Sequence, residues 1–202
     1  VEDDEDPMLV CPPDVTLQNN DPGQCNAFVS IAEPLVSDNC GIATLTNSFT
    51  NTSNASGVYP IGTTTVIWTV TDVNGNISTC EQSVTVVDVE GPVISCGENI
   101  TVNTDPGQCS ADLSIEPPVA TDNCGLGSLV NSITGTSNAS GIYEAGIHTI
   151  IWTATDNYGN QSTCEQTIEV IDSEVPSITC PDDIVVSASA SSCEAQVAVP
   201  QP

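Results

Sequence analysis

The sequence predicts an all-β protein built from tandem immunoglobulin-like antiparallel β-sandwich repeats that are stapled by disulfides. Three observations carry this prediction: runs in which apolar and polar residues alternate, motifs that return after 84 residues, as from Cys25 to Cys109, and ten cysteines in a chain of 202 residues. Val, Ile and Thr favour strands, while 14 Pro and 14 Gly provide turns between them. An even and dense set of cysteines is typical of secreted domains.

Each repeat contains short alternating runs that we interpret as strands in chain order. In the first repeat they lie at 15–17, 27–31, 66–70 and 84–86, and their counterparts lie at 100–102, 111–115, 150–154 and 168–170, with further runs at 184–186 and 195–199. A period of two with a polar opposite face indicates half-buried strands. About seven strands in a repeat of this length is the size of an immunoglobulin-like domain. Trp68 and its counterpart Trp152 are expected in the two cores.

The repeated motifs also set the domain limits. Asp-Pro-Gly-Gln-Cys, Asp-Asn-Cys-Gly and Thr-Ser-Asn-Ala-Ser-Gly each occur twice at the same spacing. We therefore expect a linker from a preceding repeat at 1–6, a first repeat at 7–91, a second at 92–175 and the start of a third, truncated repeat at 176–202. The parent protein is then expected to be a longer array.

The charge of the chain excludes several classes of function. There are 27 Asp and Glu residues but no Lys or Arg, which gives a net charge of -27. Nothing in the chain can neutralise phosphate, so neither nucleic acid nor direct contact with an anionic membrane is expected. Because side-chain ion pairs with Lys or Arg are impossible, a buried carboxylate needs a metal ion, a backbone donor or a proton.

Several motifs together resemble one known family. Asp-Asn-Cys-Gly at 38–41, Gly-Thr-Thr-Thr-Val-Ile-Trp-Thr-Val-Thr-Asp-Val-Asn-Gly-Asn at 62–76, Cys80 and the closing Val-Thr-Val-Val-Asp are similar to the HYR (hyalin repeat) module, and the second repeat keeps the pattern with His148 and Tyr158 as departures. The resemblance implies an extracellular immunoglobulin-like module associated with cell adhesion. The four-cysteine array resembles the repeats of large surface adhesins of gliding bacteria that are exported by type IX secretion.

The four cysteines of each repeat allow three pairings within one repeat. The partial third copy holds only Cys180 and Cys193, and if these two pair, the first two cysteines of every repeat pair as well. This reasoning predicts the following bonds, all within repeats: Cys11–Cys25, Cys40–Cys80, Cys96–Cys109, Cys124–Cys164 and Cys180–Cys193.

Recurring carboxylates suggest a calcium site at each repeat junction. In a sandwich with an odd number of strands, the chain enters at one end and leaves at the other. The linker before such a domain therefore lies beside the loop that follows the second strand and the loop that precedes the last strand. Hard divalent ions bind six to eight such oxygens, and calcium suits an extracellular setting. The first predicted ligand set is Asp3, Glu5, Asp38, Asp72 and Asn74, and the second is Asp88, Glu90, Asp122 and Asp156, with Asn123 and Asn157 as helpers. Asp-Asn and Asp-x-x-Gly-Asn are also common turn sequences, so simple turn chemistry stays the alternative.

These observations favour a non-catalytic structural and adhesive role over an enzyme. Each acidic cluster is duplicated, and His148 has Thr64 at the matching position, so no catalytic arrangement recurs. We expect a calcium-stiffened stalk at the cell surface whose partners are neighbouring repeats, with cell-surface components or polysaccharide as further candidates. The alternatives are a carbohydrate- or ligand-binding module that uses the loop at 52–57, and a subunit of a self-assembling extracellular filament.

Overall fold

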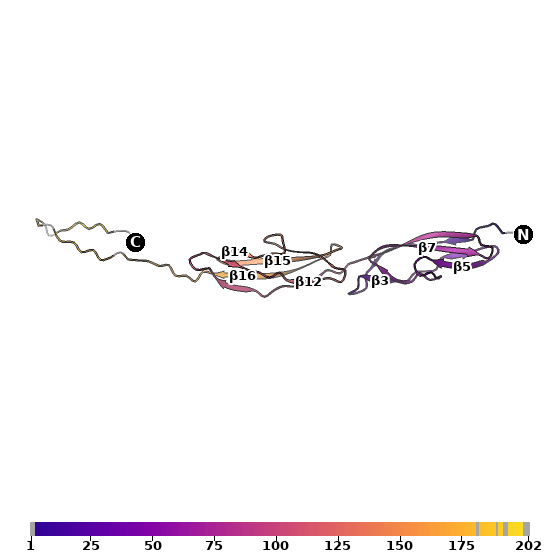
Figure 1. Ribbon diagram of the computed structural model, residues 1–202, viewed down its shortest axis with the longest axis horizontal. Coiled ribbons are helices and arrows are strands. Elements are labelled where there is room, and N and C mark those ends of the chain that lie inside the picture. The colour runs from indigo at the N-terminus through magenta and orange to yellow at the C-terminus, as the bar shows by residue number, and fades with distance from the viewer. Residues whose placement is uncertain (1–2, 181, 189, 192–193, 200–202) are drawn as a thin grey trace.

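A computed structural model describes residues 3–180, 182–188, 190–191 and 194–199 of the chain. Two sandwiches lie end to end along one long axis, with the N-terminus at one extreme and the segment after the second sandwich leaving at the other (Figure 1). The strands of the first are Met8–Val10 (β1), Val15–Asn19 (β2), Asn26–Val29 (β3), Leu35–Ser37 (β4), Ile42–Asn47 (β5), Gly57–Pro60 (β6), Gly62–Asp72 (β7) and Ile77–Val87 (β8). Those of the second are Val93–Ser95 (β9), Ile100–Asn103 (β10), Ser110–Leu113 (β11), Val119–Thr121 (β12), Leu126–Asn131 (β13), Gly141–Glu144 (β14), Gly146–Asp156 (β15) and Gln161–Ile171 (β16).

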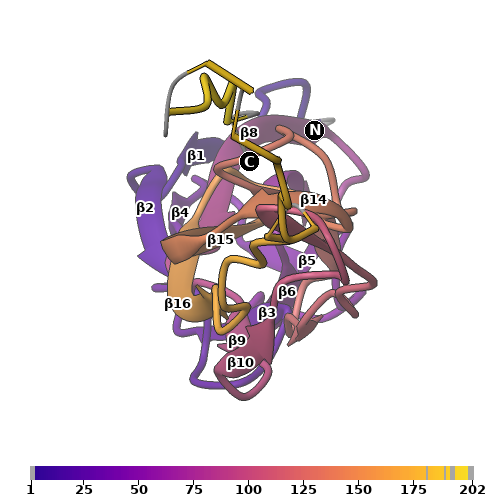
Figure 2. The same cartoon turned by 90° about the vertical axis from the view of Figure 1, so that its left-hand side faces the viewer.

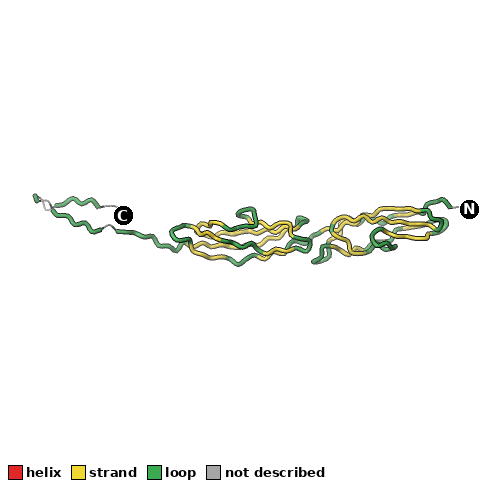
Figure 3. Tube along the Cα trace, in the orientation of Figure 1, coloured by secondary structure: helices red, strands yellow, loops and turns green. Residues whose placement is uncertain are grey.

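Strands and loops make up the described residues, which confirms the all-β fold class (Figure 3). They include no helix of the length and apolar character that a membrane span needs. Each repeat has a four-stranded sheet, ordered β2-β8-β7-β5 in the first and β10-β16-β15-β13 in the second. The shorter pairs β1-β4 and β3-β6, and their counterparts β9-β12 and β11-β14, complete the sandwiches, which overlap when viewed along the long axis (Figure 2).

One strand pair in each repeat departs from the expected antiparallel pattern. β2 runs parallel to β8, and β10 runs parallel to β16. The chain enters a repeat at one end and leaves it at the other, so an early strand, β2 or β10, shares a direction with the last strand of its repeat. When those strands become neighbours they must therefore pair in parallel. Alternation within each strand does not reveal this pairing.

The core lies between the long strands and the shorter pairs. Val66 and Trp68 of β7 pack with Ala27 of β3 and Tyr59 of β6, and all four are fully buried. The Trp68 indole N–H donates to the Gln82 side chain at 3.1 Å, so its one polar group is satisfied in the core. Trp152 repeats this arrangement in the second core, and the prediction for both tryptophans is confirmed.

The disulfides correct the predicted pairing. Cys11 is bonded to Cys80, and Cys96 to Cys164, so the predicted bonds Cys11–Cys25, Cys40–Cys80, Cys96–Cys109 and Cys124–Cys164 are wrong. The parallel pairing is the physical reason. It places the segment between β1 and β2, which carries Cys11, beside β8, which carries Cys80. Cys25 lies beyond β2, at the far end of the repeat.

The third disulfide joins the two repeats. It links Cys25 to Cys124, with 4.8 Å between the two Cα atoms. The expectation that every disulfide closes within one repeat is therefore wrong. Cys40, Cys109 and Cys180 are exposed and unpaired among the described residues. The predicted Cys180–Cys193 bond falls outside the described residues, because Cys193 is not among them.

The described part of the third repeat forms no strand. Ile184 and Val186, which were predicted to alternate in a strand, are 46% and 47% exposed, and Val199 is 72% exposed. In both complete repeats the corresponding strand bonds to the last strand of its own repeat. The described residues of the third repeat contain no such partner, so the alternating pattern alone does not produce a strand there.

Candidate metal and docking site at the repeat junction

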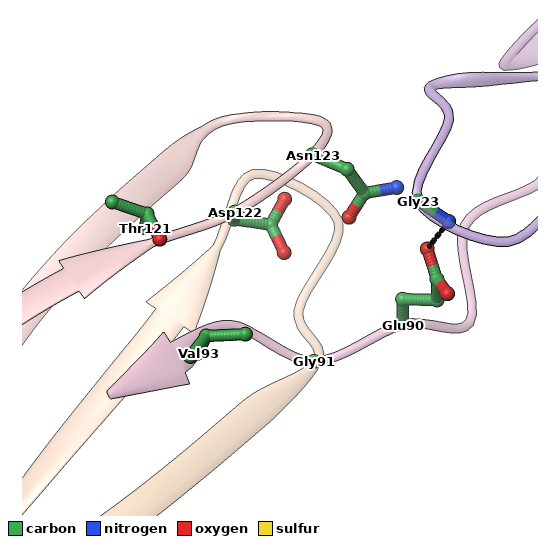
Figure 4. A pocket seen from close by; sticks show the side chains of 7 residues that line it. All are labelled: Gly23, Glu90, Gly91, Val93, Thr121, Asp122 and Asn123. Atoms are coloured by element: carbon green, nitrogen blue, oxygen red, sulfur yellow. Dashed lines mark hydrogen bonds between the residues drawn. The ribbon is translucent and has the colours of Figure 1, made fainter. Parts of the chain in front are cut away.

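Four segments from two repeats meet at the junction. The linker at 88–92 follows β8 and leads into β9, the loop at 122–125 follows β12, and the turn at 157–160 joins β15 to β16. The preceding repeat contributes its turn at 21–25, after β2. Figure 4 shows the loop that carries Asp122 and Asn123 facing the linker, marked by Glu90, and the turn that carries Gly23. The linker, the loop at 122–125 and the turn at 21–25 contribute residues to the lining of a cavity of about 380 Å³, which Val93 and Thr121 complete.

Two carboxylates at this junction, the buried Asp88 and the half-buried Asp122, are incompletely hydrogen-bonded. The Asp88 side chain is 8% exposed, and one of its oxygens accepts from the Glu90 backbone N–H at 3.2 Å. One Asp122 oxygen accepts from the Cys124 backbone N–H at 2.7 Å. The second oxygen of each carboxylate is buried and has no hydrogen-bond partner among the described residues. Burial raises the pKa of Asp88, and the nearby charges of Asp122 and Asp156 raise it further.

These two carboxylates are close enough to share a cation. Candidate ligand atoms of Asp88, Asp122 and Cys124 all lie within 4.8 Å of one another. The Cys124 sulfur is part of a disulfide, so it is not available as a thiolate. Two unit charges at that separation repel by about 3.5 kcal/mol at an effective dielectric of 20. A divalent cation would remove this repulsion and supply the missing partner of both free oxygens.

The other carboxylate predicted for this site organises a turn instead. Asp156 accepts hydrogen bonds from the backbone N–H groups of Tyr158 and Asn160 and from the Asn160 side chain, at 2.7 to 2.9 Å. Burial alone would raise its pKa, but these bonds lower it. Asp156 lies outside the group formed by Asp88 and Asp122. The turn alternative therefore describes Asp156.

Glu90 has a role that the sequence did not reveal. Its carboxylate accepts from the Gly23 backbone N–H at 2.8 Å (Figure 4). It also accepts from the Asn20 side chain at 3.1 Å, and both donors belong to the preceding repeat. The predicted helper Asn123 also reaches across and donates to the Gln24 carbonyl at 3.0 Å. Glu90 and Asn123 thus dock one repeat on the other, and the structure does not bring Glu90 into the carboxylate group.

The helper Asn157 and the unpredicted Asn160 hold the loops of this site together. The Asn157 side chain donates to the Cys124 carbonyl at 3.2 Å. Asn160 donates to the Asp88 carbonyl at 3.2 Å, and Asn76 makes the same bond to the Asp3 carbonyl. The sequence signal that identifies Asn76 and Asn160 is the Gly-Asn pair that ends the turn at the same place in each repeat.

The matching cluster at the other end of the first repeat brings together three predicted ligands. Candidate ligand atoms of Asp3, Asp38 and Asp72 lie within 4.8 Å of one another. Asn74 donates to Asp3 at 2.9 Å, whereas Glu5 is turned aside and accepts from the Asn39 side chain at 2.8 Å.

Hydrogen bonds set the pKa values of this cluster. The Cys40 thiol and the Asn74 amide beside Asp3 lower the pKa of its carboxyl. Burial opposes ionisation of Asp72, but bonds from Asn76 and from the turn backbone lower its pKa overall. Asp72 therefore shares the turn role of Asp156 while also belonging to the group that Asp3 and Asp38 form.

The loop proposed for ligand binding uses its polar groups internally. The Asn47 side chain donates to the Thr52 carbonyl at 2.7 Å, and the Thr50 hydroxyl donates to the Asn54 carbonyl at 2.6 Å. The Tyr59 hydroxyl donates to the buried Ala55 carbonyl at 2.7 Å. In the second repeat, His148 lies against Tyr143 and the Glu144 carbonyl and lines a cavity of about 320 Å³ together with residues 139–141 of the matching loop. This pattern favours a structural role for the loop over ligand capture.

Comparisons with known proteins bear on both repeats. The sequence profile described as HYR domain matches residues 2–86 and 87–170. Hyalin of Lytechinus variegatus is 28% identical over 206 residues, which cover 97% of this chain and 37% of hyalin. Hyalin of Strongylocentrotus purpuratus is 30% identical over 186 residues, which cover 89% of this chain and 15% of hyalin.

Two of the solved structures that match this chain share little sequence identity with it. Human protocadherin-24 EC1-2 is 15% identical, with 83% of this chain and 99% of that chain covered and a TM-score of 0.38. The insect immune protein hemolin is 14% identical, with 82% of this chain and 47% of that chain covered and a TM-score of 0.40.

Proposed function

The chain belongs to the HYR domain family, and from this premise we propose that it is a non-catalytic extracellular stalk with an adhesive role, stiffened by calcium at its repeat junctions. The observation that carries the calcium proposal is the pair of buried, unpartnered oxygens on Asp88 and Asp122. With no Lys or Arg in the chain, no side-chain ion pair with either residue can neutralise these carboxylates.

The extracellular part of the proposal is supported by the disulfides. Three bonds form among the described residues, and one of them joins the two repeats. Such bonds persist in oxidising compartments and are rare in the cytosol. Extracellular calcium sites can bind as weakly as ~10⁻³ M and still be filled where calcium is millimolar.

The proposed role of the metal is mechanical. Asp88 belongs to the linker, and Asp122 belongs to the body of the second repeat. Glu90, two residues after Asp88 in the same linker, contacts the first repeat. A cation held by the two aspartates would fix the linker against the second repeat. That linker already contacts the first repeat, so the angle between the repeats would be fixed as well.

The metal is tested by adding and removing it. With millimolar calcium we expect a higher melting temperature and a narrower range of lengths in small-angle scattering than with chelator. Titration calorimetry should detect calcium binding that Asp122→Asn weakens and Asp112→Asn leaves intact, because Asp112 is exposed on β11. Identical melting and scattering curves, together with no heat of binding, would show that these carboxylates only shape turns.

The bacterial setting is a further part of the proposal. It is supported by the resemblance of the four-cysteine repeats to large gliding adhesins exported by type IX secretion. The matched hyalins do not bear on it. Genes for type IX secretion beside the full-length gene would support this setting, and their absence from the genome would contradict it.

A further inference from the structure

Each outer end of the two-repeat unit carries one of the two segments that meet at the internal junction. At the junction, the turn at 21–25 meets the loop at 122–125 through the Cys25–Cys124 disulfide and the bond from Asn123 to the Gln24 carbonyl. Each outer end carries one half of this arrangement. The turn at 105–109 lies at the far end of the second repeat, and the loop at 38–41 lies at the near end of the first.

The half at the far end has the same local structure as its docked counterpart. In both turns the Gln backbone N–H donates to the carbonyl of the first Asp at 2.9 Å, and the third residue is a glycine of positive φ, 71° at Gly23 and 73° at Gly107. Glu174 accepts from the Gly107 backbone N–H at 3.0 Å, as Glu90 does from Gly23. Cys109 is exposed and lines a cavity of about 470 Å³ with Asp172 and Glu174.

The half at the near end is the matching loop. The Cys40 backbone N–H donates to Asp38 at 2.8 Å, as that of Cys124 donates to Asp122 at 2.7 Å. Cys40 is exposed and unpaired among the described residues. A cavity of about 270 Å³ beside it is lined by Glu5, Asp6, Met8, Ser37, Asp38 and Asn39.

We propose that Cys109 and Cys40 are disulfide partners of further repeats of the same kind, so that every junction of a tandem array is covalently locked. Cys109 would bond to the Asp-Asn-Cys cysteine of a following repeat, and Cys40 to the Asp-Pro-Gly-Gln-Cys cysteine of a preceding one. Each bond forms when two thiols lose two protons and two electrons to a disulfide oxidant, which is itself reduced to two thiols. The inference does not depend on calcium.

The test inserts a second copy of residues 92–175 between Val175 and Pro176 of the full chain, with Cys109→Ser in the inserted copy. The protein is oxidised with oxidised glutathione, isolated as a monomer and mapped by mass spectrometry without reduction. We expect a peptide that joins Cys109 to Cys124, besides the one that joins Cys25 to Cys124. Because Cys109 and Cys124 lie at opposite ends of one repeat, such a bond in a monomer must cross the new junction.

The matched control changes Cys124 to Ser in the inserted copy and should leave Cys109 fully open to iodoacetamide. Formation of Cys96–Cys164 in both copies reports that both have folded. A folded monomer in which Cys109 still reacts fully would overturn the proposal, as would a bond from Cys109 to any other cysteine.

A second arm uses the original chain and decides the matter if the inserted repeat does not fold. In a background with Cys180→Ser and Cys193→Ser, the Cys40→Ser and Cys109→Ser proteins are mixed under the same oxidant. We expect a covalent dimer through Cys109 of one copy and Cys40 of the other, in excess over dimers of either protein alone. A random yield of the three dimers would contradict the proposed fit between the two ends.

Discussion

The near ends of the two repeats carry equivalent acidic and amide residues, but these residues have different hydrogen-bond partners. At the internal junction, Glu90 contacts Gly23, and Asn123 contacts the Gln24 carbonyl. At the near end of the first repeat, their counterparts Glu5 and Asn39 bond to each other at 2.8 Å. The acid and the amide thus satisfy one another at the near end of the first repeat, whereas at the internal junction each has a backbone partner in the preceding repeat instead.

The acidic clusters at these two ends also differ: Cys40 is a thiol beside Asp3 whereas Cys124 is in a disulfide, and one substitution adds a second difference. Asn74 donates to the Asp3 side chain at 2.9 Å. The matching position in the second repeat is Tyr158, which is 52% exposed and has no amide to donate. Asp88 is therefore left with a buried, unpartnered oxygen where Asp3 has a donor. The proposed cation would therefore supply a missing partner at the internal junction that Asp3 already has in Asn74.

The largest expected effect comes from breaking the covalent part of the junction. The Cys25–Cys124 bond spans 99 residues of sequence, and in the chain-entropy model such a closure contributes about 4–5 kcal/mol. Cys25→Ser together with Cys124→Ser should lower the free energy of unfolding by up to that amount and broaden the scattering profile. Cys40→Ser should leave both unchanged in the two-repeat chain. Chemical denaturation that does not distinguish the two proteins would show that the bond contributes nothing to the junction.

The next effect should reverse sign with calcium. Asp88→Asn removes one of two close charges, so without calcium it should stabilise the protein, by at most the roughly 3.5 kcal/mol of repulsion between them. With millimolar calcium it should destabilise the protein, because a ligand is lost. Melting of the variant and of Asp112→Asn, with and without chelator, measures both. A shift of the same sign in the two conditions would argue against a cation at Asp88.

The sequence predicts which segments meet at each junction, but not all of the partners that their residues have there. The shared direction of entry and exit put the linker beside both loops, and Asp3, Asp38 and Asp72 do come together. Alternation does not distinguish parallel from antiparallel neighbours, so the closeness of Cys11 to Cys80 was missed. Pairing Cys180 with Cys193 assumed that each repeat closes on itself, whereas Cys25 bonds across the junction. Asp88 and Glu90 are both acidic residues of the same linker, so the sequence does not distinguish them. Their roles differ because the turn at 21–25 of the first repeat lies beside Glu90.

A smaller effect should separate docking from metal binding. Glu90→Gln keeps an acceptor but loses the charge that strengthens the bonds to Gly23 and Asn20. Hydrogen bonds to charged groups contribute about 1.5–3 kcal/mol, so we expect a loss of about 1–2 kcal/mol in the free energy of unfolding. Glu5→Gln should cost less, because its partner Asn39 lies in an exposed contact of the same repeat. Calorimetry should show calcium affinity unchanged in Glu90→Gln, and a large loss of affinity would return Glu90 to the ligand set.

The smallest effect tests whether a single side chain explains the difference between the two clusters. Tyr158→Asn restores in the second repeat the amide that Asn74 supplies in the first, and we expect it to donate to the free oxygen of Asp88. Without calcium this bond should stabilise the protein by about 1 kcal/mol, the usual net contribution of a hydrogen bond. With calcium the amide competes with the ion for that oxygen, so the stabilisation should shrink and calcium should bind less tightly. Asn74→Tyr is the reverse change and should leave Asp3 without its donor, making the first cluster more dependent on calcium. Denaturation of both variants with and without chelator measures these four values, and if the two substitutions act alike, the difference between the clusters does not arise from this position.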